Sequence, residues 1–425
     1  MAEILHPRTD TSSRSVARLG DATTTLDDAE VRDLVRSQLD AVDLDGARVC
    51  VLVPDRTRRC PLPLLSRAVD TALAGRAAHV TVLVALGTHV ALDDGDLHPH
   101  TGLAPRAGLD IRNHEWWDDA TFATIGRIEE DRVAALSGGL LREAVDVRVN
   151  RAVVDADVTL IVGPVVPHEV VGFSGGNKYL FPGVSGPEMI DVSHWLGALI
   201  TSAEIIGTTG TTPVRALIDD AAALVPSRRL ALCAVTVPGG DRLRTVTFGD
   251  PEPAWAAAAA VAAETHVRYL DRPVRRVLSL VPSRYDDLWT GAKGFYKVEP
   301  VVADGGEVVL HAPHITEIAA MHPAVRDIGY HCRDYFLGQW DRFRHVHRGD
   351  VAHSTHLRGA GTWDPAAGER CRVTVTLATG IPEDEVRAVG LEYRDPASID
   401  LDEWSRDPDT LVVPDAGEQL FRLRR

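Results

Sequence analysis

The order of apolar and polar positions predicts that strands and helices alternate along the first part of the chain. Short apolar runs bounded by turn residues predict buried strands over 48–53, 79–85 and 109–112. Apolar residues at helical spacing predict helices over 28–42 and 62–74. Strands that alternate with helices are typical of a parallel sheet covered by helices, so we expect the α/β class.

The same alternation continues through the middle of the chain. Apolar runs predict strands over 152–154, 158–162 and 230–237, and helical spacing predicts helices over 213–224 and 252–266. Beyond residue 270 the pattern is less regular. It predicts strands and one helix or turn, followed by an irregular charged tail; the ranges are 276–281, 286–293 (helix or turn), 305–310 and 373–377.

The length and a change in composition predict the domain organisation. A chain of 425 residues suits two domains or more, and the composition changes near 269–273. We therefore expect a polar N-terminal tail over 1–25, an N-terminal α/β domain over 26–270 and a C-terminal α/β domain over 271–425. Both domains should have parallel-sheet character.

Composition and charge exclude some classes of partner. The 45% hydrophobic and 25% charged content is ordinary for a soluble globular protein. The formal net charge of -16 gives no basic footprint for nucleic acid or an anionic membrane, although local basic residues could bind a small anion. We see no signal peptide and no apolar segment near the ~20 residues that span a bilayer. The five scattered cysteines suit a reducing compartment, so we expect a cytoplasmic protein. Because the charge excludes extended polyanions, we expect its partner to be a small molecule.

Polar side chains follow the first three predicted strands. Asp55 and Arg58 follow the first strand, His89 the second and His114 the third. In parallel sheets ligands bind beyond the carboxyl ends of the strands. An arginine there suits recognition of a carboxylate, with a surface ion pair as the alternative.

The stretch 164–199 concentrates groups that bind or transfer charge. His168, Lys178 and His194 lie in it, and the glycine-rich turn 172–176 precedes the lysine. Such a turn lets backbone N–H groups approach an anion closely. The stretch therefore predicts a binding site.

Further residues of this stretch predict how the site is built. Ser185 and Glu188 fit a capping box, and Pro187 suits a first helical turn, so we expect a helix that carries His194. The lysine does not belong to a phosphate-binding P-loop, because Asn177 and Tyr179 stand where that pattern needs glycine and a hydroxyl residue.

Histidine types and positions suggest acid–base chemistry. His168 follows a predicted strand end and ordinarily titrates near neutrality, and His89 could supply a matching base. Two histidines that face one carbon from opposite sides would suit a racemase. His194 alone would more simply be a core histidine, and Lys178 a solvated loop charge.

The remaining histidines enter no predicted site. His353 and His356 have a loose metal-ligand spacing, and we leave them out of the site. Six others lack a convincing local frame and are expected to be structural or exposed: His98, His100, His311, His314, His322 and His331. Lys293 and Lys297 would add positive charge to a substrate pocket.

Taken together, these segments resemble the lactate racemase family, whose members use a nickel-pincer nucleotide. The resemblance runs in order from about Val49 to Leu310. It rests on Asp55-Arg-Thr-Arg58, Gly87-Thr-His89, Asn113-His114, the stretch His168 to Gly186 with Ser174-Gly-Gly-Asn-Lys178 inside it, His194 and Ala292-Lys-Gly294. The implied fold has two α/β domains with the cofactor in a cleft between them.

The resemblance assigns residues to the cofactor. Lys178 corresponds to the lysine that holds it covalently through a thioamide. His194 corresponds to the protein ligand of nickel, whose other donors are one carbon and two sulfurs of the cofactor, and planar nickel with imidazole is chemically reasonable. Further cofactor contacts are implied for Thr57, Ser174, Gly175, Gly176 and Thr290.

The resemblance also implies a mechanism. His89 and His168 correspond to paired general bases, and Asp55, Arg58 and Lys293 to residues that orient the cofactor, the histidines or the substrate carboxylate. One histidine would remove the hydroxyl proton of a 2-hydroxy acid while the C2 hydride passes to the cofactor. The hydride would then return to the other face, inverting C2.

The chain departs from the family near the predicted pocket. Thr290 stands where the family has a glutamine three residues before its second lysine, and the neighbouring aromatic residue is Trp289. Trp340 is a candidate for a C-terminal tryptophan of the family, and Trp116 and Trp117 could shape the cavity. These differences suggest a substrate other than lactate.

Other functions stay open at this point. The same cofactor could serve net oxidation, reduction or elimination on a related hydroxy acid. His89, His114 and His168 could instead bind zinc in a metallohydrolase. A ligand-sensing α/β protein without enzymatic activity is the last alternative.

Overall fold

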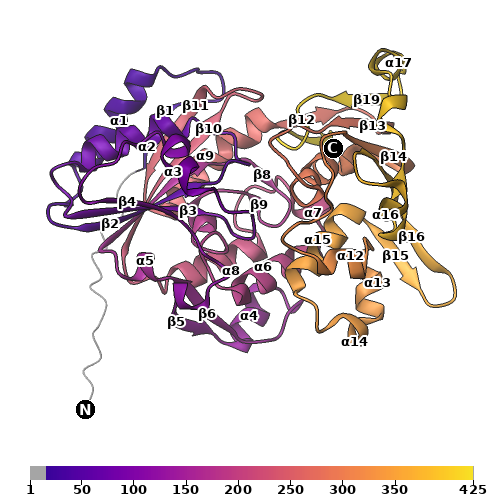
Figure 1. The fold of residues 1–425 in the computed structure, drawn as a ribbon, viewed down its shortest axis with the longest axis horizontal. Coiled ribbons are helices and arrows are strands. Elements are labelled where there is room, and N and C mark those ends of the chain that lie inside the picture. Colours follow the sequence, from indigo (N-terminus) through magenta and orange to yellow (C-terminus); the bar gives the residue numbers. More distant parts are fainter. Residues whose placement is uncertain (1–15, 425) are drawn as a thin grey trace.

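The computed structural model describes residues 16–424 of the chain, which form two α/β units, each built on its own sheet (Figure 1). Helices alternate with mostly parallel strands in both units. The α/β class predicted from the sequence is therefore confirmed. No helix within residues 16–424 is both long enough and apolar enough to cross a bilayer.

The larger sheet has seven strands in the order β1-β11-β10-β7-β2-β3-β4. The strands from β10 to β4 pair in parallel, and β11 and β1 extend the sheet in antiparallel fashion. In spatial order the strands are β1 (Ala17–Gly20), β11 (Leu243–Gly249), β10 (Arg228–Thr236), β7 (Val158–Pro164), β2 (Arg48–Pro54), β3 (His79–Ala85) and β4 (Leu109–Asn113).

Both faces of this sheet are buried because its side chains alternate between two helical layers. On β2, Val49, Val51 and Val53 pack into a core with α1 and α2, while Cys50 and Leu52 pack into a core with α6, α8 and α9. Such double coverage is typical of parallel sheets. The covering helices are α1 (Asp28–Asp40), α2 (Leu62–Leu73), α6 (Pro187–Ile200), α8 (Pro213–Ala222) and α9 (Pro251–His266).

The smaller sheet has five strands in the order β18-β17-β14-β13-β19, all paired in parallel. Helix α15 of this unit packs against α6 of the first unit, so the two units share an interface. The strands are β18 (Glu392–Tyr393), β17 (Val373–Thr379), β14 (Val302–Ala312), β13 (Val274–Leu280) and β19 (Thr410–Val413), and the helices next to the interface are α10 (Leu288–Gly291), α11 (Lys293–Tyr296) and α15 (Arg348–Arg358).

Shorter elements complete the two units. Among them, β5 pairs with β6, β8 with β9, β12 with β20 and β15 with β16. Their bounds are α3 (Asp94–Thr101), β5 (Phe122–Ile128), α4 (Glu130–Leu136), β6 (Val145–Asn150), α5 (Arg151–Val154), β8 (Pro167–His168), β9 (Gly172–Phe173), η2 (Gly176–Tyr179), α7 (Ser202–Ile205), β12 (Val267–Leu270), α12 (Ala324–Ile328), α13 (Arg333–Gly338), α14 (Trp340–Phe343), β15 (Gly361–Asp364), β16 (Gly368–Cys371), α16 (Glu383–Ala388), α17 (Leu401–Arg406) and β20 (Leu420–Leu423).

Three local predictions were wrong. The apolar run 152–154 belongs to α5 rather than to a strand, because the Asn150 side chain accepts a hydrogen bond from the Ala152 N–H and starts a helix there. The predicted capping box of Ser185 and Glu188 is absent. Gly186, rather than Ser185, is the N-cap of α6, and the Glu188 carboxylate accepts a hydrogen bond from Arg148. The C-terminal segment is ordered into α17, β19 and β20 rather than an irregular tail.

The chain ends also bear on the domain organisation. Part of the stretch 1–25, expected to be a tail, forms β1 at the edge of the larger sheet, while residues 1–15 lie outside the described part. Strand β12 pairs with the C-terminal β20, and the smaller sheet begins at Val274 in β13. We propose the boundary between the two units near residue 270.

Candidate active site

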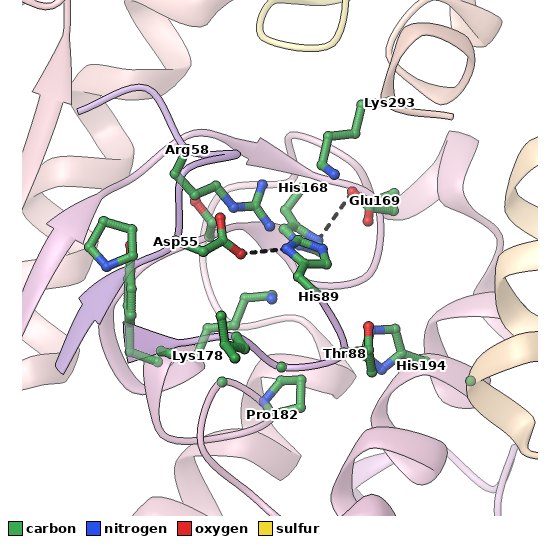
Figure 2. A pocket seen from close by; sticks show the side chains of 18 of the residues that line it. Asp55, Arg58, Thr88, His89, His168, Glu169, Lys178, Pro182, His194 and Lys293 are labelled. Atoms are coloured by element: carbon green, nitrogen blue, oxygen red, sulfur yellow. Dashed lines mark hydrogen bonds and ion pairs between the residues drawn. The ribbon is translucent and has the colours of Figure 1, made fainter. Parts of the chain in front are cut away.

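A cleft between the two units collects the groups that the sequence analysis predicted at strand ends (Figure 2). Its cavity volume is about 100 Å³. Strands β2, β3 and β7 run parallel, so their carboxyl ends meet at one edge of the larger sheet. Nine of the twelve predicted site residues line the cleft: Asp55, Arg58, His89, His168, Ser174, Gly175, Lys178, His194 and Lys293.

His89 is held by a carboxylate. Its Nδ1 lies 2.5 Å from Asp55 Oδ2, and the Thr57 hydroxyl donates to Asp55 Oδ1 at 2.6 Å. Burial opposes the charge on Asp55, but His89 and Arg58 keep the pKa of that carboxyl below its usual range. The charged carboxylate accepts the Nδ1 proton of His89, which leaves the lone pair on Nε2. His89 is therefore set up as a base.

His168 has a different environment. The Val170 N–H donates to its Nδ1 at 3.2 Å, and Glu169 Oε2 lies 3.3 Å from the same nitrogen. Burial, followed by the charges of Lys178 and Arg58, holds the pKa of His168 well below its ordinary value. The ring is thus neutral near pH 7. The Val170 N–H favours an unprotonated Nδ1, whereas the Glu169 carboxylate favours a protonated one.

Two cations, Arg58 and Lys293, line the cleft together with the histidines (Figure 2). Arg58 comes from the loop after β2, and burial opposes its charge, but Asp55 and Glu169 raise the pKa of its guanidinium. Lys293 begins α11, where it is only 4% exposed and its Nζ donates to the Thr290 carbonyl at 3.4 Å. Burial and then Arg58 lower the pKa of Lys293 to about 8. Together the pair can bind one small carboxylate.

The glycine-rich turn fixes the position of Lys178. Gly175 and Gly176 have φ of +84° and +59°, and a Cβ there would lie 2.6 Å from Val165 Cγ2 and 2.9 Å from Trp255 Cβ. Both positions thus need glycine for backbone conformation and for packing. The turn leads into η2, from which Lys178 lines the cleft.

Burial keeps His194 neutral near pH 7 and leaves Lys178 partly neutral. Burial, then the charge of Arg58, lowers the pKa of Lys178 to about 7, so its amine is partly unprotonated near neutrality. The His194 Nδ1–H donates to the Ile190 carbonyl at 2.8 Å, and burial lowers the His194 pKa to about 4. A neutral imidazole that is fixed through Nδ1 offers Nε2 as a ligand.

The structure does not bring together the proposed zinc triad. His114 is fully buried, with Nδ1 3.0 Å from Asn150 Nδ2 and Nε2 3.4 Å from the Ser185 carbonyl oxygen. Both ring nitrogens thus have protein partners. Residues 16–424 contain no group of three or more His, Cys, Asp or Glu side chains arranged to hold a metal. The interpretation with zinc on His89, His114 and His168 is wrong.

Three predicted cofactor contacts are missing among the residues that line this cleft: Thr57, Gly176 and Thr290. Thr57 and Thr290 line a neighbouring cavity instead, where they bond Asp55 and Asp287. Gly176 is covered by Trp255. These residues support lining groups rather than face the cleft themselves.

Of the tryptophans named in the sequence analysis, one lines the cleft and the others do not. Trp289 lines the cleft, whereas Trp340 stacks on Trp195 with ring centroids 5.0 Å apart and is absent from the lining residues that the structure describes. Trp116 donates to the His89 carbonyl at 3.3 Å, and Trp117 is half exposed.

The sequence analysis missed the histidines that the second unit brings to the cleft. His353 and His356 lie three residues apart on α15, and both line it. The Trp289 ring stacks between His353 and His322, at centroid distances of 4.0 and 3.8 Å. The His356 Nε2 is buried and has no hydrogen-bond partner in the described part of the chain. No local pattern revealed these positions, because only the packing of α15 on α6 brings them near the strand ends.

Lysine usage is a signal that could have located the site. Only three of the 45 lysine and arginine residues are lysines. Lys178 and Lys293 line the cleft, and the buried Lys297 donates to the Glu418 carbonyl at 3.1 Å nearby. A chain that otherwise uses arginine keeps lysine where an amine can lose its proton.

Comparisons with known proteins point to one family. The model of the lactate racemase N-terminal domain matches residues 14–207. Lactate racemase from Lactiplantibacillus plantarum is 24% identical over 274 residues, which make up 62% of this chain and 59% of that protein. Lactate racemase from Thermoanaerobacterium thermosaccharolyticum is 26% identical over 150 residues, 34% of this chain and 32% of that protein. The matches thus span less than two thirds of these relatives.

Solved structures extend the likeness over nearly the whole chain. The crystal structure of a protein from Thermotoga maritima matches with a TM-score of 0.88 at 30% identity, covering 96% of this chain and 100% of that one. The lactate racemase apoprotein from Thermoanaerobacterium thermosaccharolyticum matches with a TM-score of 0.70 at 16% identity, covering 93% of each chain. The second likeness concerns the fold alone.

Proposed function

The chain belongs to the lactate racemase family, and on this premise we propose that it is an isomerase, a racemase or epimerase that inverts C2 of a 2-hydroxy acid. One observation carries the proposal. His89 and His168, which follow different strands, line one cleft together with the cation pair Arg58 and Lys293. Two bases and a carboxylate site are what inversion of a 2-hydroxy acid requires.

The residues of the cleft fit a nickel-pincer nucleotide. Lys178 offers a partly neutral amine for a covalent bond, because burial lowers its pKa to about 7. His194 offers a free Nε2 to nickel, because its Nδ1–H is held by the Ile190 carbonyl. We propose that Lys178 and His194 hold this cofactor. When bound, it would supply the group that accepts a hydride from C2 and returns it.

The protein's own part in the reaction is positioning and proton transfer. Arg58 and Lys293 would hold the substrate carboxylate while C2 changes configuration. His89 would take the hydroxyl proton through Nε2, with Asp55 stabilising the imidazolium that forms. His168 would serve the opposite enantiomer in the same way. Thr57 would act indirectly, by fixing Asp55 through its hydroxyl.

The resemblance to the family implies a difference beside the cleft at Thr290, which lines a neighbouring cavity next to Trp289 of the cleft itself. Trp289 stacks between two histidines, so its ring forms a rigid flat wall of the cleft. We propose that this wall selects a 2-hydroxy acid other than lactate.

Loading and activity test the proposal together. The full-length chain, co-expressed with the enzymes that make the cofactor, should gain mass at Lys178 and bind one nickel per chain. It should then convert one enantiomer of a 2-hydroxy acid into the other. Lys178→Arg is the control, because it keeps a long basic side chain but lacks the amine that forms the covalent bond. An unmodified Lys178, or a Lys178→Arg variant with full activity, would overturn the proposal.

A further inference from the structure

The two histidines of the cleft differ in what their Nδ1 atoms contact. At His89 the carboxylate of Asp55 lies 2.5 Å from Nδ1 and can only accept a proton, while the Thr57 hydroxyl lies farther away, at 3.5 Å, and donates to Asp55. At His168 the Val170 N–H donates to Nδ1 at 3.2 Å. A nitrogen that accepts a hydrogen bond carries no proton, so in this arrangement the neutral ring of His168 has its proton on Nε2. In that form Nε2 can donate but cannot take a proton.

A second partner offers His168 the opposite tautomer. Glu169 Oε2 lies 3.3 Å from the same Nδ1 (Figure 2). A carboxylate accepts and never donates while it is charged, so it favours a proton on Nδ1. Moving the proton to Nδ1 frees the lone pair of Nε2 for a base. The tautomer of His168 thus depends on which neighbour holds Nδ1.

The surroundings of Glu169 keep it charged. Burial opposes that charge, but Lys293 and His356 act against burial, and the net effect lowers the Glu169 pKa. Its side chain is 14% exposed, so water weakens its field only slightly. Glu169 is therefore a charged carboxylate within ion-pair distance of the His168 Nδ1.

From this geometry we propose that Glu169 is the positioning residue that makes His168 a base, by holding a proton on its Nδ1. The inference rests on the proposed function, because it concerns how one of its two bases works. When His168 is doubly protonated, Nδ1–H bonds Glu169 and Nε2–H passes to the substrate alkoxide. The ring is then neutral, its one proton stays on Nδ1 and is hydrogen-bonded to Glu169, and Nε2 can take the next hydroxyl proton. Without Glu169 the Val170 N–H retains Nδ1, and Nε2 stays protonated.

The first test reads the tautomer in the full-length protein without cofactor. The nitrogen chemical shifts of ¹⁵N-labelled histidine report which ring nitrogen carries the proton, and His168→Gln identifies the signals. Glu169→Gln keeps the shape but removes the charge, and should move the His168 signals toward the form protonated on Nε2. Asp191→Asn is the matched control, since that carboxylate contacts His347 and the Gly349 N–H instead of His168. Identical His168 signals in wild type and Glu169→Gln would overturn the inference.

The second test uses the loaded enzyme and single turnovers. Each enantiomer gives its hydroxyl proton to a different histidine, so Glu169→Gln should slow formation of the 2-keto acid from one enantiomer by ~10-fold or more. The other enantiomer should react at the wild-type rate. Equal slowing of both enantiomers would mean a merely structural role for Glu169.

The pH dependence of kcat in Glu169→Gln gives a third readout. The direction of its shift follows from the loss of a negative charge beside His168. A carboxylate stabilises the imidazolium, so its removal lowers the pKa of His168 and moves the acidic limb of the kcat profile to lower pH. The other groups that act on His168 stay unchanged in the variant: Arg58, Lys178, His194 and Lys297. An unmoved limb would contradict the inference.

These tests separate the inference from the proposed function. If the loaded wild type racemises its substrate but the His168 nitrogen signals are the same in wild type and Glu169→Gln, the inference alone fails. If the signals respond to Glu169 but the loaded protein inverts no 2-hydroxy acid, the proposed function fails instead.

Discussion

The two walls of the cleft are built in different ways. The strand-end wall, formed by Asp55, His89, His168 and Lys178, comes from loops beyond parallel strands of the larger sheet. The helical wall comes from α10, α11 and α15 of the second unit, and its members are Trp289, Lys293, Tyr296, His353 and His356.

The difference between the walls suggests that one wall serves proton transfer and the other serves substrate binding. On the strand-end wall each histidine has a carboxylate within 3.3 Å of Nδ1, which under the proposed mechanism would prepare it for proton transfer. On the helical wall Trp289 and His353 are stacked, and the pKa of the buried His353 lies well below its ordinary value, so this stacked part is neutral and Lys293 supplies the charge of the wall. We expect changes to the first wall to lower kcat, and changes to the second wall to alter KM and substrate choice.

The largest effect should follow a change at the strand-end wall. Asp55→Asn removes the charge that holds the His89 Nδ1 proton, and the amide can instead donate to that nitrogen. We expect kcat to fall ~10²-fold or more with KM nearly unchanged, because a correctly prepared general base contributes about that much. Steady-state kinetics of the loaded enzyme check this, and a main effect on KM would erase the distinction between the walls.

A smaller effect should follow the loss of the one lysine on the helical wall. Lys293→Ala removes a charge-assisted hydrogen bond to the substrate carboxylate, worth about 1.5–3 kcal/mol. We expect kcat/KM to fall ~10- to 100-fold, mainly through KM. Lys293→Arg should recover part of the loss, since it keeps the charge. A fall in kcat alone would assign Lys293 to the chemistry of the first wall.

The pH dependence of Lys178 tests the strand-end wall before any cofactor binds. Burial disfavours the charged amine, so its proton leaves at a pKa of about 7 instead of 10.5. Acylation of Lys178 in the unloaded protein should therefore rise ~10-fold between pH 6 and 8 and then level off. An ordinary lysine would continue to rise above pH 8. Peptide mass spectrometry reads each of the three lysines separately, and a continued rise at Lys178 would refute the shift.

The smallest effect should follow a change to the stacked part of the helical wall. His353→Ala removes the ring that stacks on Trp289 at a centroid distance of 4.0 Å. We expect the free energy of unfolding to fall by about 1 kcal/mol, with kcat within a few-fold of wild type. Urea unfolding and steady-state kinetics measure both. A loss of kcat comparable to that of Asp55→Asn would make His353 part of the chemistry.

The two walls also differ in how much the sequence revealed. Short apolar runs predicted β2, β3, β4 and β7 nearly to the residue, and parallel strand ends then implied that Asp55 and His89 lie together. These elements follow from local periodicity. The turn before Lys178 was visible for the same reason, because its glycines are adjacent in the chain.

The helical wall depends on contacts between distant segments, which no local pattern encodes. His353 and His356 reach the cleft only because α15 packs on α6. Glu169 was overlooked because its position after His168 has no motif, and its role depends on the fold of the chain back toward Nδ1. The error at 152–154 has a related cause, since one capping bond from Asn150 outweighed the strand preference of valine.

The most direct test of the central claim follows inversion from both sides with the two histidines varied separately. Wild-type enzyme loaded with nickel, given either pure enantiomer of a 2-hydroxy acid, should approach the same equilibrium mixture by chiral chromatography. His89→Gln and His168→Gln should each stop the approach from both sides, because every inversion uses both bases. Inversion at the wild-type rate by either variant, or one-way accumulation of a 2-keto acid, would contradict a racemase with two bases.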